Sequence, residues 1–263
     1  MRQSVTADIE KQVRIASGSV SLGATLAVPH GAQSIVVFAH GSGSSRFSPR
    51  NNFVAEVLRV HGSGVLLMDL LTAMEDQSQK KRFDIDLLAH RLLSARQWLK
   101  EQGSLLDLTI GLFGASTGSA AALKVAAMLG KEIGAVVSRG GRPDLAEEDL
   151  AKVLSPTLLI VGGNDPTVLE LNQRAFQKLQ STKKLEIVAG ATHLFEEPGA
   201  LEQVAYLANA WFTKYLWEGT PNVSPDLSAD RSDREVSGRS RSGLRICNSI
   251  RSRSDLDACH RDH

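Results

Sequence analysis

This chain of 263 residues has few cysteines, a small net charge and only short apolar runs. Its two cysteines, Cys247 and Cys259, stand near the end, so the sequence offers neither a disulfide framework nor a zinc-binding spacing, and we expect no metal site. Lys and Arg number 30 against 29 Asp and Glu, and this net charge of +1 gives no field for attracting nucleic acid. The longest apolar stretches, such as residues 35–39, are far shorter than the roughly 20 residues that a membrane span needs.

The first residues also lack the apolar run of a secretion signal, because Asp8, Glu10 and Lys11 occupy the place where that run would lie. Together these absences predict a cytoplasmic protein that binds neither nucleic acid nor a membrane. The sequence leaves the oligomeric state open.

The chain changes character near residue 220. Ser, Arg and Asp dominate residues 220–263, and no apolar residue recurs there at a helical or strand period. Such a segment cannot bury enough apolar surface to offset the entropy lost on ordering, which predicts a disordered tail. Its Arg-Ser repeats at 239–242 and 251–254 would also suit RNA binding or phosphorylation, but interleaved Asp residues cancel their charge. Residues 1–219 are then expected to form the folded domain.

Within residues 1–219, short β-branched runs alternate with longer amphipathic stretches. This alternation is typical of an α/β fold, with a mostly parallel sheet of about eight strands and helices on both of its faces. An antiparallel hairpin is expected first, at residues 13–16 and 21–28. Further strands are expected at residues 34–39, 65–69, 108–113, 133–138, 157–161 and 184–188. Helices are expected at residues 52–61, 84–102, 118–129, 169–180 and 199–217.

The expected strand 108–113 runs directly into the sequence GASTG, with Ser116 at its centre. Between a strand and a helix this pattern is typical of a nucleophile elbow, a sharp turn that lifts the serine hydroxyl above the sheet edge. Glycines are needed on both sides because neighbouring backbones crowd the turn. The alternative is a glycine-rich turn that only packs tightly. The strand before it and the helix after it favour Ser116 as a catalytic nucleophile.

A nucleophilic serine needs a base and a group that orients the base. Asp165 follows the expected strand 157–161 and His193 follows the strand 184–188, so both should lie at the same sheet edge as Ser116. An Asp before Pro is also a common helix cap, and a loop His is often only a surface residue. The order Ser, Asp, His along the chain favours a catalytic triad.

An oxyanion hole needs backbone N–H donors beside the nucleophile. We expect them from Thr117, directly after Ser116, and from Ser42 in the sequence HGSGSS after the strand 34–39. A second HGSG at residues 61–64 follows a helix instead, so it indicates a helix stop at the opposite edge.

The motifs HGSGSS, GASTG, VGGND and GATHLFEEPG, in this order, resemble the α/β-hydrolase superfamily and most of all its dienelactone hydrolase-related branch. The likeness spans roughly residues 13–217. It implies an α/β-hydrolase fold, hydrolysis of a small carboxylic ester, thioester or lactone through an acyl-enzyme, and no cofactor. Ser116 stands where dienelactone hydrolase itself uses cysteine. Residues 138–144 and 193–199 also resemble small bacterial hydrolases, some of them fused to phosphoribosyltransferases, although this sequence has no evident phosphoribosyl-binding loop.

Three arginines are candidates for substrate binding. Arg139 and Arg142 follow the expected strand 133–138, and Arg46 lies in the loop of Ser42. A guanidinium there could hold a carboxylate or phosphate, or Arg139 and Arg142 could brace the loop between them. Residues 142–154 have room for one short helix only, so we expect little or no lid and a small or open pocket.

Two other functions remain open. The same fold can bind a ligand without turnover. The strand 34–39, Gly41, Gly43 and Asp69 also imitate a dinucleotide-binding fingerprint, although Arg46 replaces its third glycine.

Overall fold

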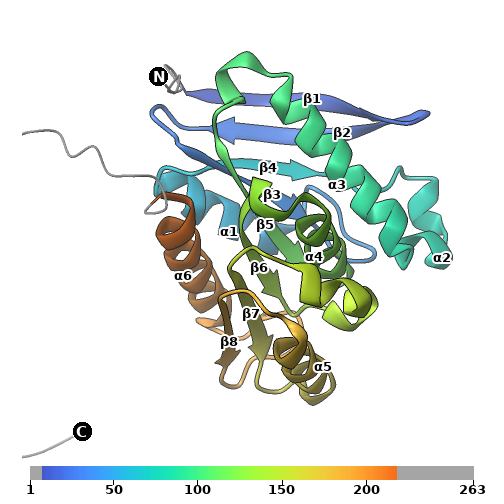
Figure 1. Ribbon diagram of the computed structural model, residues 1–263, viewed down its shortest axis with the longest axis vertical. Coiled ribbons are helices and arrows are strands. Elements are labelled where there is room, and N and C mark those ends of the chain that lie inside the picture. Colours follow the sequence, from blue (N-terminus) through green and yellow to red (C-terminus); the bar gives the residue numbers. More distant parts are fainter. Residues whose placement is uncertain (1–7, 218–263) are drawn as a thin grey trace, which may run out of the picture. The chain divides into compact units, whose positions relative to one another are not determined.

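The computed structural model describes residues 8–217, which are built on one eight-stranded sheet (Figure 1). The strands are β1 (Ile9–Ser17), β2 (Val20–Val28), β3 (Ser34–Ala39), β4 (Gly64–Met68), β5 (Thr109–Ala115), β6 (Ile133–Arg139), β7 (Thr157–Gly162) and β8 (Lys183–Val188). Their order across the sheet is β1-β2-β4-β3-β5-β6-β7-β8. β1 and β2 form an antiparallel hairpin, β2 is antiparallel to β4, and all later pairs are parallel. The predicted mostly parallel sheet of eight strands is confirmed, whereas the predicted tail and its two cysteines lie outside the described residues.

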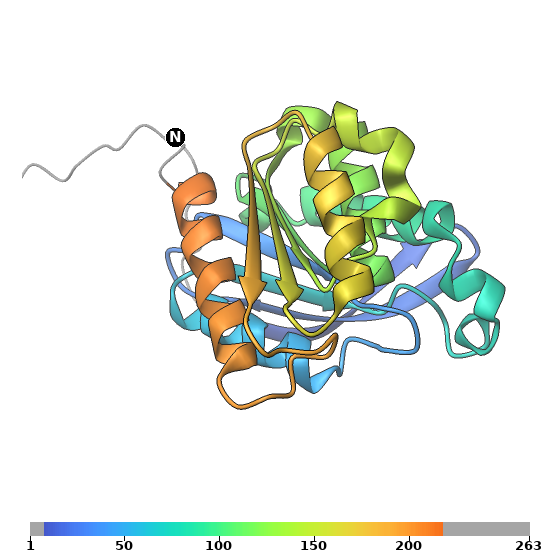
Figure 2. The ribbon, with the colours of Figure 1, turned by 90° about the horizontal axis from the view of Figure 1, so that it is seen from below.

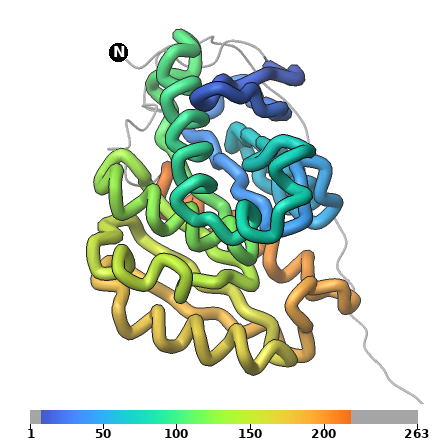
Figure 3. Tube along the Cα trace, turned by 90° about the vertical axis from the view of Figure 1, so that its right-hand side faces the viewer, coloured from blue at the N-terminus to red at the C-terminus, as the bar shows by residue number. Residues whose placement is uncertain are grey.

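Helices cover both faces of this sheet (Figure 2). They are α1 (Pro49–Val60), α2 (Gln79–Arg82), α3 (Ile85–Lys100), α4 (Thr117–Leu129), α5 (Pro166–Lys178) and α6 (Ala200–Phe212). α1 and α6 pack against one face, and α3, α4 and α5 pack against the other. The hairpin of β1 and β2 lies at the end of the sheet away from α5 (Figure 3). Each helix within residues 8–217 is too short or too polar to cross a lipid bilayer.

Alternating side chains of the central strands supply two separate cores. In β3, Ile35 and Val37 belong to the core shared with α3 and α4, whereas Val36 and Phe38 pack with α1 and α6. All six residues of β3 are buried. A strand covered on both faces is apolar at nearly every position, which explains the continuous apolar run at residues 35–39.

The element ends differ from the sequence prediction where a cap or a turn decides them. α1 begins at Pro49 rather than at residue 52, because Ser48 accepts a hydrogen bond from the amide of Asn51 and Pro suits the first helical position. The last expected helix ends at Phe212 and continues as a π-helical turn, Thr213–Trp217. The short helix α2 was not expected from the sequence.

The carboxyl ends of the parallel strands meet at one edge of the sheet, where α/β folds place their sites. The connection from β6 to β7 contains only a 3₁₀-helical segment, Pro143–Lys152. This segment is too short for a large lid, as the sequence predicts.

We predict that Gly118→Ala lowers the free energy of unfolding by about 1–3 kcal/mol, because the backbones must separate to admit the methyl group. A Cβ at Gly118 would overlap the carbonyl oxygens of Ala39 and His40, where α4 begins against the end of β3. Gly103→Ala is the matched control, since its added methyl group would meet no atom within 4 Å. Urea denaturation checks this, and equal stability of the two variants would contradict the close approach.

Candidate active site

Ser116 occupies the sharp turn between β5 and α4. Its backbone has φ 50° and ψ −122°, a conformation that non-glycine residues rarely adopt. Within residues 8–217, Phe195 is the other non-glycine residue with positive φ. The Ser116 side chain does not cap α4, which leaves its hydroxyl available for chemistry. Such local strain persists where the surrounding structure holds it in place, and it is concentrated at functional sites.

Backbone hydrogen bonds from the end of β6 hold this turn. The amide of Ser116 donates to the carbonyl of Arg139 at 3.2 Å. The carbonyl of Ser116 accepts from the amides of Arg142 and Ser119, each at 3.1 Å. The backbone of residues 139–142 therefore braces the turn of Ser116.

The loop after β3 passes directly against Ser116. A Cβ on Gly41 would lie 2.9 Å from the Cβ of Ser116, so glycine is needed for this approach. Ser42 follows and lines the same cavity as Ser116. Thr117 is the first residue of α4, where a helix leaves its N–H groups without intrahelical partners. Their roles as oxyanion-hole donors stay predictions.

His193 and Asp165 meet beyond the ends of β8 and β7. The carboxylate Oδ2 of Asp165 lies 2.7 Å from Nδ1 of His193. The side chain of Asp165 also caps α5 by accepting from the amide of Val168 at 3.5 Å. The two interpretations of Asp165, helix cap and partner of a histidine, are therefore compatible. Because Nδ1 of His193 is hydrogen-bonded to this carboxylate, Nε2 is the ring nitrogen that can accept a proton.

Backbone contacts fix the loops that carry this pair. The amide of Asn164 donates to the carbonyl of Ala191 at 2.9 Å, and its side-chain amide donates to the carbonyl of Gly190 at 2.9 Å. A Cβ at Gly162 would overlap the carbonyl oxygen of Ala191. The close approach of β7 and its following loop to the loop after β8 places His193 beside Asp165.

Ser116 and His193 line one cavity of about 160 Å³. Ser42 from the loop after β3 and Asn51 from α1 contribute to the same wall. Pockets for drug-sized ligands are typically about 300–1,000 Å³, so this one suits a small group.

Arg139 lines the same cavity and is buried, with 8% of its surface exposed. Its Nη2 donates to Oδ1 of Asn51 at 3.4 Å, whereas its Nε and Nη1 have no partner among the described residues. Burial, and then repulsion from Arg50, lowers the pKa of Arg139 to about 10. The side chain therefore remains charged at neutral pH.

The other two candidate arginines have acidic partners. Arg142 donates to Asp144 from Nε at 2.9 Å and from Nη2 at 2.8 Å. Arg46 forms an ion pair with Asp69, which also accepts from the Arg46 amide. Neither arginine is among the residues that line the cavity, so their role in substrate binding stays a prediction. Asp69, the acid of the imitated dinucleotide fingerprint, is already engaged by this arginine.

Sequence reasoning missed His40, which joins the loop after β3 to the chain after β4. The ring is buried. Its Nδ1 lies 2.9 Å from the carbonyl oxygen of Gly41, and its Nε2 accepts from the amide of Leu70 at 2.9 Å. Burial lowers the pKa of His40 below its usual value of 6.5. The sequence contains His40 within HGSGSS, but only the fold shows what the ring contacts.

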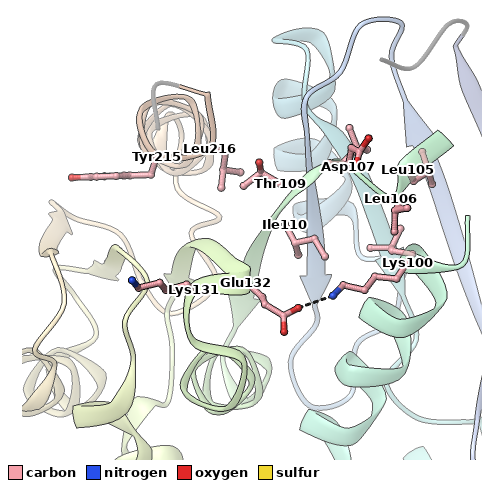
Figure 4. A pocket seen from close by; sticks show the side chains of 12 residues that line it. Lys100, Leu105, Leu106, Asp107, Thr109, Ile110, Lys131, Glu132, Tyr215 and Leu216 are labelled. Carbon is pink, nitrogen blue, oxygen red and sulfur yellow. Dashed lines mark hydrogen bonds and ion pairs between the residues drawn. The ribbon is translucent and has the colours of Figure 1, made fainter. Parts of the chain in front are cut away.

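A larger cavity, of about 390 Å³, lies near the opposite ends of the strands (Figure 4). Its walls include Leu105 before β5, Ile110 at the start of β5, and Leu216. Lys100 also lines it and is paired with Glu132 at 2.8 Å. The described residues that line it include no Ser, Cys or His. The cavity at Ser116 is the candidate active site because it brings the strained serine turn together with a histidine that is bonded to a carboxylate.

Comparisons with known proteins identify the family of the chain and its relatives. Residues 23–218 match the sequence model of the dienelactone hydrolase family. Two proteins of Mycobacterium tuberculosis, provisionally named phosphoribosyl transferases, are 54% identical over 207 residues, which is 79% of this chain and 47% of each relative. The chain thus spans about half the length of the curated relatives it matches.

Solved structures give the same fold. A dienelactone hydrolase from Anabaena variabilis is 52% identical, with a TM-score of 0.77 over 80% of this chain and 99% of its own. Est1E from Butyrivibrio proteoclasticus is 16% identical, with a TM-score of 0.67 over 78% of this chain and 98% of its own. The predicted α/β-hydrolase fold is confirmed.

We predict that the unfolding free energy falls as the pH drops below about 6.5. In that range His40 binds a proton in the unfolded chain but not in the folded protein, where burial lowers its pKa. The contribution of His40 to the unfolding free energy is fully present at a pH above its pKa in the unfolded chain. This contribution is lost as the pH falls toward its lower pKa in the folded protein. The slope from one such group reaches at most about 1.4 kcal/mol per pH unit. His40→Gln should reduce this slope, as measured by urea denaturation between pH 5 and 8.

His61→Gln, which replaces an exposed histidine, is the control. Parallel pH curves for wild type and His40→Gln would contradict the prediction.

Proposed function

Because the chain belongs to the dienelactone hydrolase family, we propose that it is a serine hydrolase that cleaves a small ester, thioester or lactone. The observation that carries this proposal is that His193, which is bonded to Asp165, lines the same cavity as the strained turn of Ser116. A nucleophile, a base and a group that orients the base are the parts that acyl transfer requires. The small cavity favours a short acyl group.

In the proposed first step, Nε2 of His193 takes the hydroxyl proton of Ser116 while Oγ attacks the substrate carbonyl carbon. Asp165 holds Nδ1 and stabilises the imidazolium that forms. The amides of Ser42 and Thr117 donate to the oxyanion of the tetrahedral intermediate. His193 then returns the proton to the leaving group, which departs and leaves an acyl-serine.

In the second step, water attacks the acyl carbon after losing a proton to His193. The same oxyanion donors serve again. Collapse of the second tetrahedral intermediate breaks the bond to Oγ, returns the proton to Ser116 and releases the carboxylic acid. No cofactor is needed for either step.

The phosphoribosyl transferase activity in the names of the relatives is not part of this proposal. The two Mycobacterium tuberculosis proteins are about twice as long as the part they share with this chain, so their names describe proteins with further sequence. The cavity observed here supports the hydrolase. A ligand-binding protein without turnover is the rival that the following experiments separate from it.

We predict that a fluorophosphonate probe labels the wild-type protein covalently and fails to label Ser116→Ala, because the reaction needs an activated serine Oγ. Ser104→Ala, which removes an exposed serine, is the control and should be labelled like the wild type. Labelling is read by intact-protein mass spectrometry. An unlabelled wild type, or equal labelling of Ser116→Ala, would refute the assignment of the nucleophile.

We predict that Asp165→Asn lowers kcat for a p-nitrophenyl ester by about 10,000-fold, because the amide favours the wrong tautomer of His193. Asn is as good a helix cap as Asp, so the stability should change little. Asp84→Asn is the matched control, since Asp84 caps α3 in the same way away from the cavity. A loss of less than tenfold in Asp165→Asn, or an equal loss in both variants, would count against the triad.

A further inference from the structure

β1 is the last strand at one end of the sheet, and its outer edge has no strand beside it within residues 8–217 (Figure 1). All nine of its residues pair with β2, so it is a long and regular edge strand. Such an edge presents a row of unpaired N–H and C=O groups to which another strand can bind. The outer edge of β1 is therefore a candidate interaction surface.

The hydrogen bonds of β2 show which residues of β1 turn their backbone groups outward. The amide of Asp69 donates to the carbonyl of Gly23 at 2.9 Å, so the backbone of Gly23 faces β4 rather than β1. Arg14 lies opposite Gly23 in the register, and its backbone groups consequently face away from β2. This direction alternates along a strand, so Glu10 and Gln12 also turn their N–H and C=O groups outward.

The charged side chains at these outward positions lack partners of opposite sign. Glu10 and Arg14 are exposed, and neither forms an ion pair with another residue of the described part of the chain. Arg14 donates to the hydroxyl and the carbonyl of Ser21 at 3.0 and 2.6 Å, which leaves its charge uncompensated. On the opposite edge strand, β8, Nζ of Lys184 lies 2.5 Å from Oε1 of Glu186. β1 thus differs from β8 in carrying two opposite charges that are available to a second chain.

We propose that two copies of this chain dimerise by antiparallel pairing of their β1 strands around a two-fold axis at Gln12. In this register Gln12 lies opposite its own copy, and Glu10 of each chain lies opposite Arg14 of the other. Ile9 lies opposite Ile15 on the face that packs against the core shared with α3. The dimer thus gains cross-strand ion pairs on one face and cross-strand apolar pairs on the other, each of them twice by symmetry.

Neighbouring registers fit this strand less well. An axis at Lys11 would place the two Lys11 ammonium groups opposite each other, and axes at Glu10 or Arg14 would also oppose like charges. An axis at Val13 would place Arg14 opposite Gln12 and leave Glu10 without an opposite charge. Lysine on an edge strand often prevents unwanted pairing, but the axis at Gln12 places Lys11 opposite the uncharged Val13. Charge complementarity therefore selects both the partner, a second copy of this chain, and the register.

The first test is sedimentation velocity of the full chain over a micromolar concentration series, in which we expect the wild type to show a monomer–dimer equilibrium. Glu10→Arg opposes like charges twice in each dimer, so it should raise the dissociation constant at least about tenfold. Arg14→Glu should act in the same way. The double variant Glu10→Arg/Arg14→Glu should restore dimerisation, because it exchanges the two charges. Glu148→Arg makes the same charge change at an exposed position of the segment Pro143–Lys152, and this control should dimerise like the wild type.

The second test measures the register by cross-linking, in a chain that also carries Cys247→Ser and Cys259→Ser. Gln12→Cys should form a disulfide-linked dimer on oxidation, because directly opposed residues of a hydrogen-bonded pair have Cα atoms about 5.5 Å apart. Glu10→Cys is the matched control. It is opposite position 14 of the other chain, too far from its own copy for a disulfide, and should stay unlinked. Non-reducing gel electrophoresis measures both.

A wild type that stays monomeric throughout the concentration series would overturn the proposal. So would a dimer that neither charge reversal weakens, because such a dimer must use another surface. Failure of the double variant to dimerise, or equal cross-linking of Gln12→Cys and Glu10→Cys, would refute the register. None of the described residues that line the cavity at Ser116 belongs to β1, so these outcomes do not depend on the proposed hydrolysis.

Discussion

The close approach of three backbones at the carboxyl edge of the sheet is the constraint on which the site depends. Ser116 sits in a backbone conformation that costs free energy, and it persists only because the end of β6 and the loop after β3 hold it. Gly41 and Gly118 permit those contacts, since a side chain at either position would collide with the neighbouring chain. The same packing that stabilises the α/β body therefore also positions the serine hydroxyl.

Charge is distributed unevenly around this turn. Asp165 and His193 form a matched pair, and most other ion pairs of the described residues lie on the surface, where each contributes little to stability. Arg139 is different because it is buried and lacks an anionic partner. A fold tolerates such a residue when the remaining packing supplies enough stability.

Much of the site could be predicted because its residues directly follow strands. A parallel α/β sheet places every strand-end loop on one edge, so Ser116, Asp165 and His193 could be assigned to one rim from their position alone. Position also separated the two HGSG sequences: the first follows β3, and the second links α1 to β4 at the opposite edge. Element ends were less predictable, because Ser48 and Pro49 start α1 earlier than the apolar period suggests.

By itself the sequence determined the fold class, the strands along the chain whose following loops form the rim, and the residue types on that rim, because these follow from the hydrophobic period and the chain order. Only the tertiary structure decided which side chains are paired. Arg46, Arg139 and Arg142 look alike in the sequence, yet two of them have carboxylate partners and one is buried facing the cavity without one. The contacts of His40 and Asn51 were hidden for the same reason: pairing depends on distances between segments far apart in the chain, which no local pattern specifies.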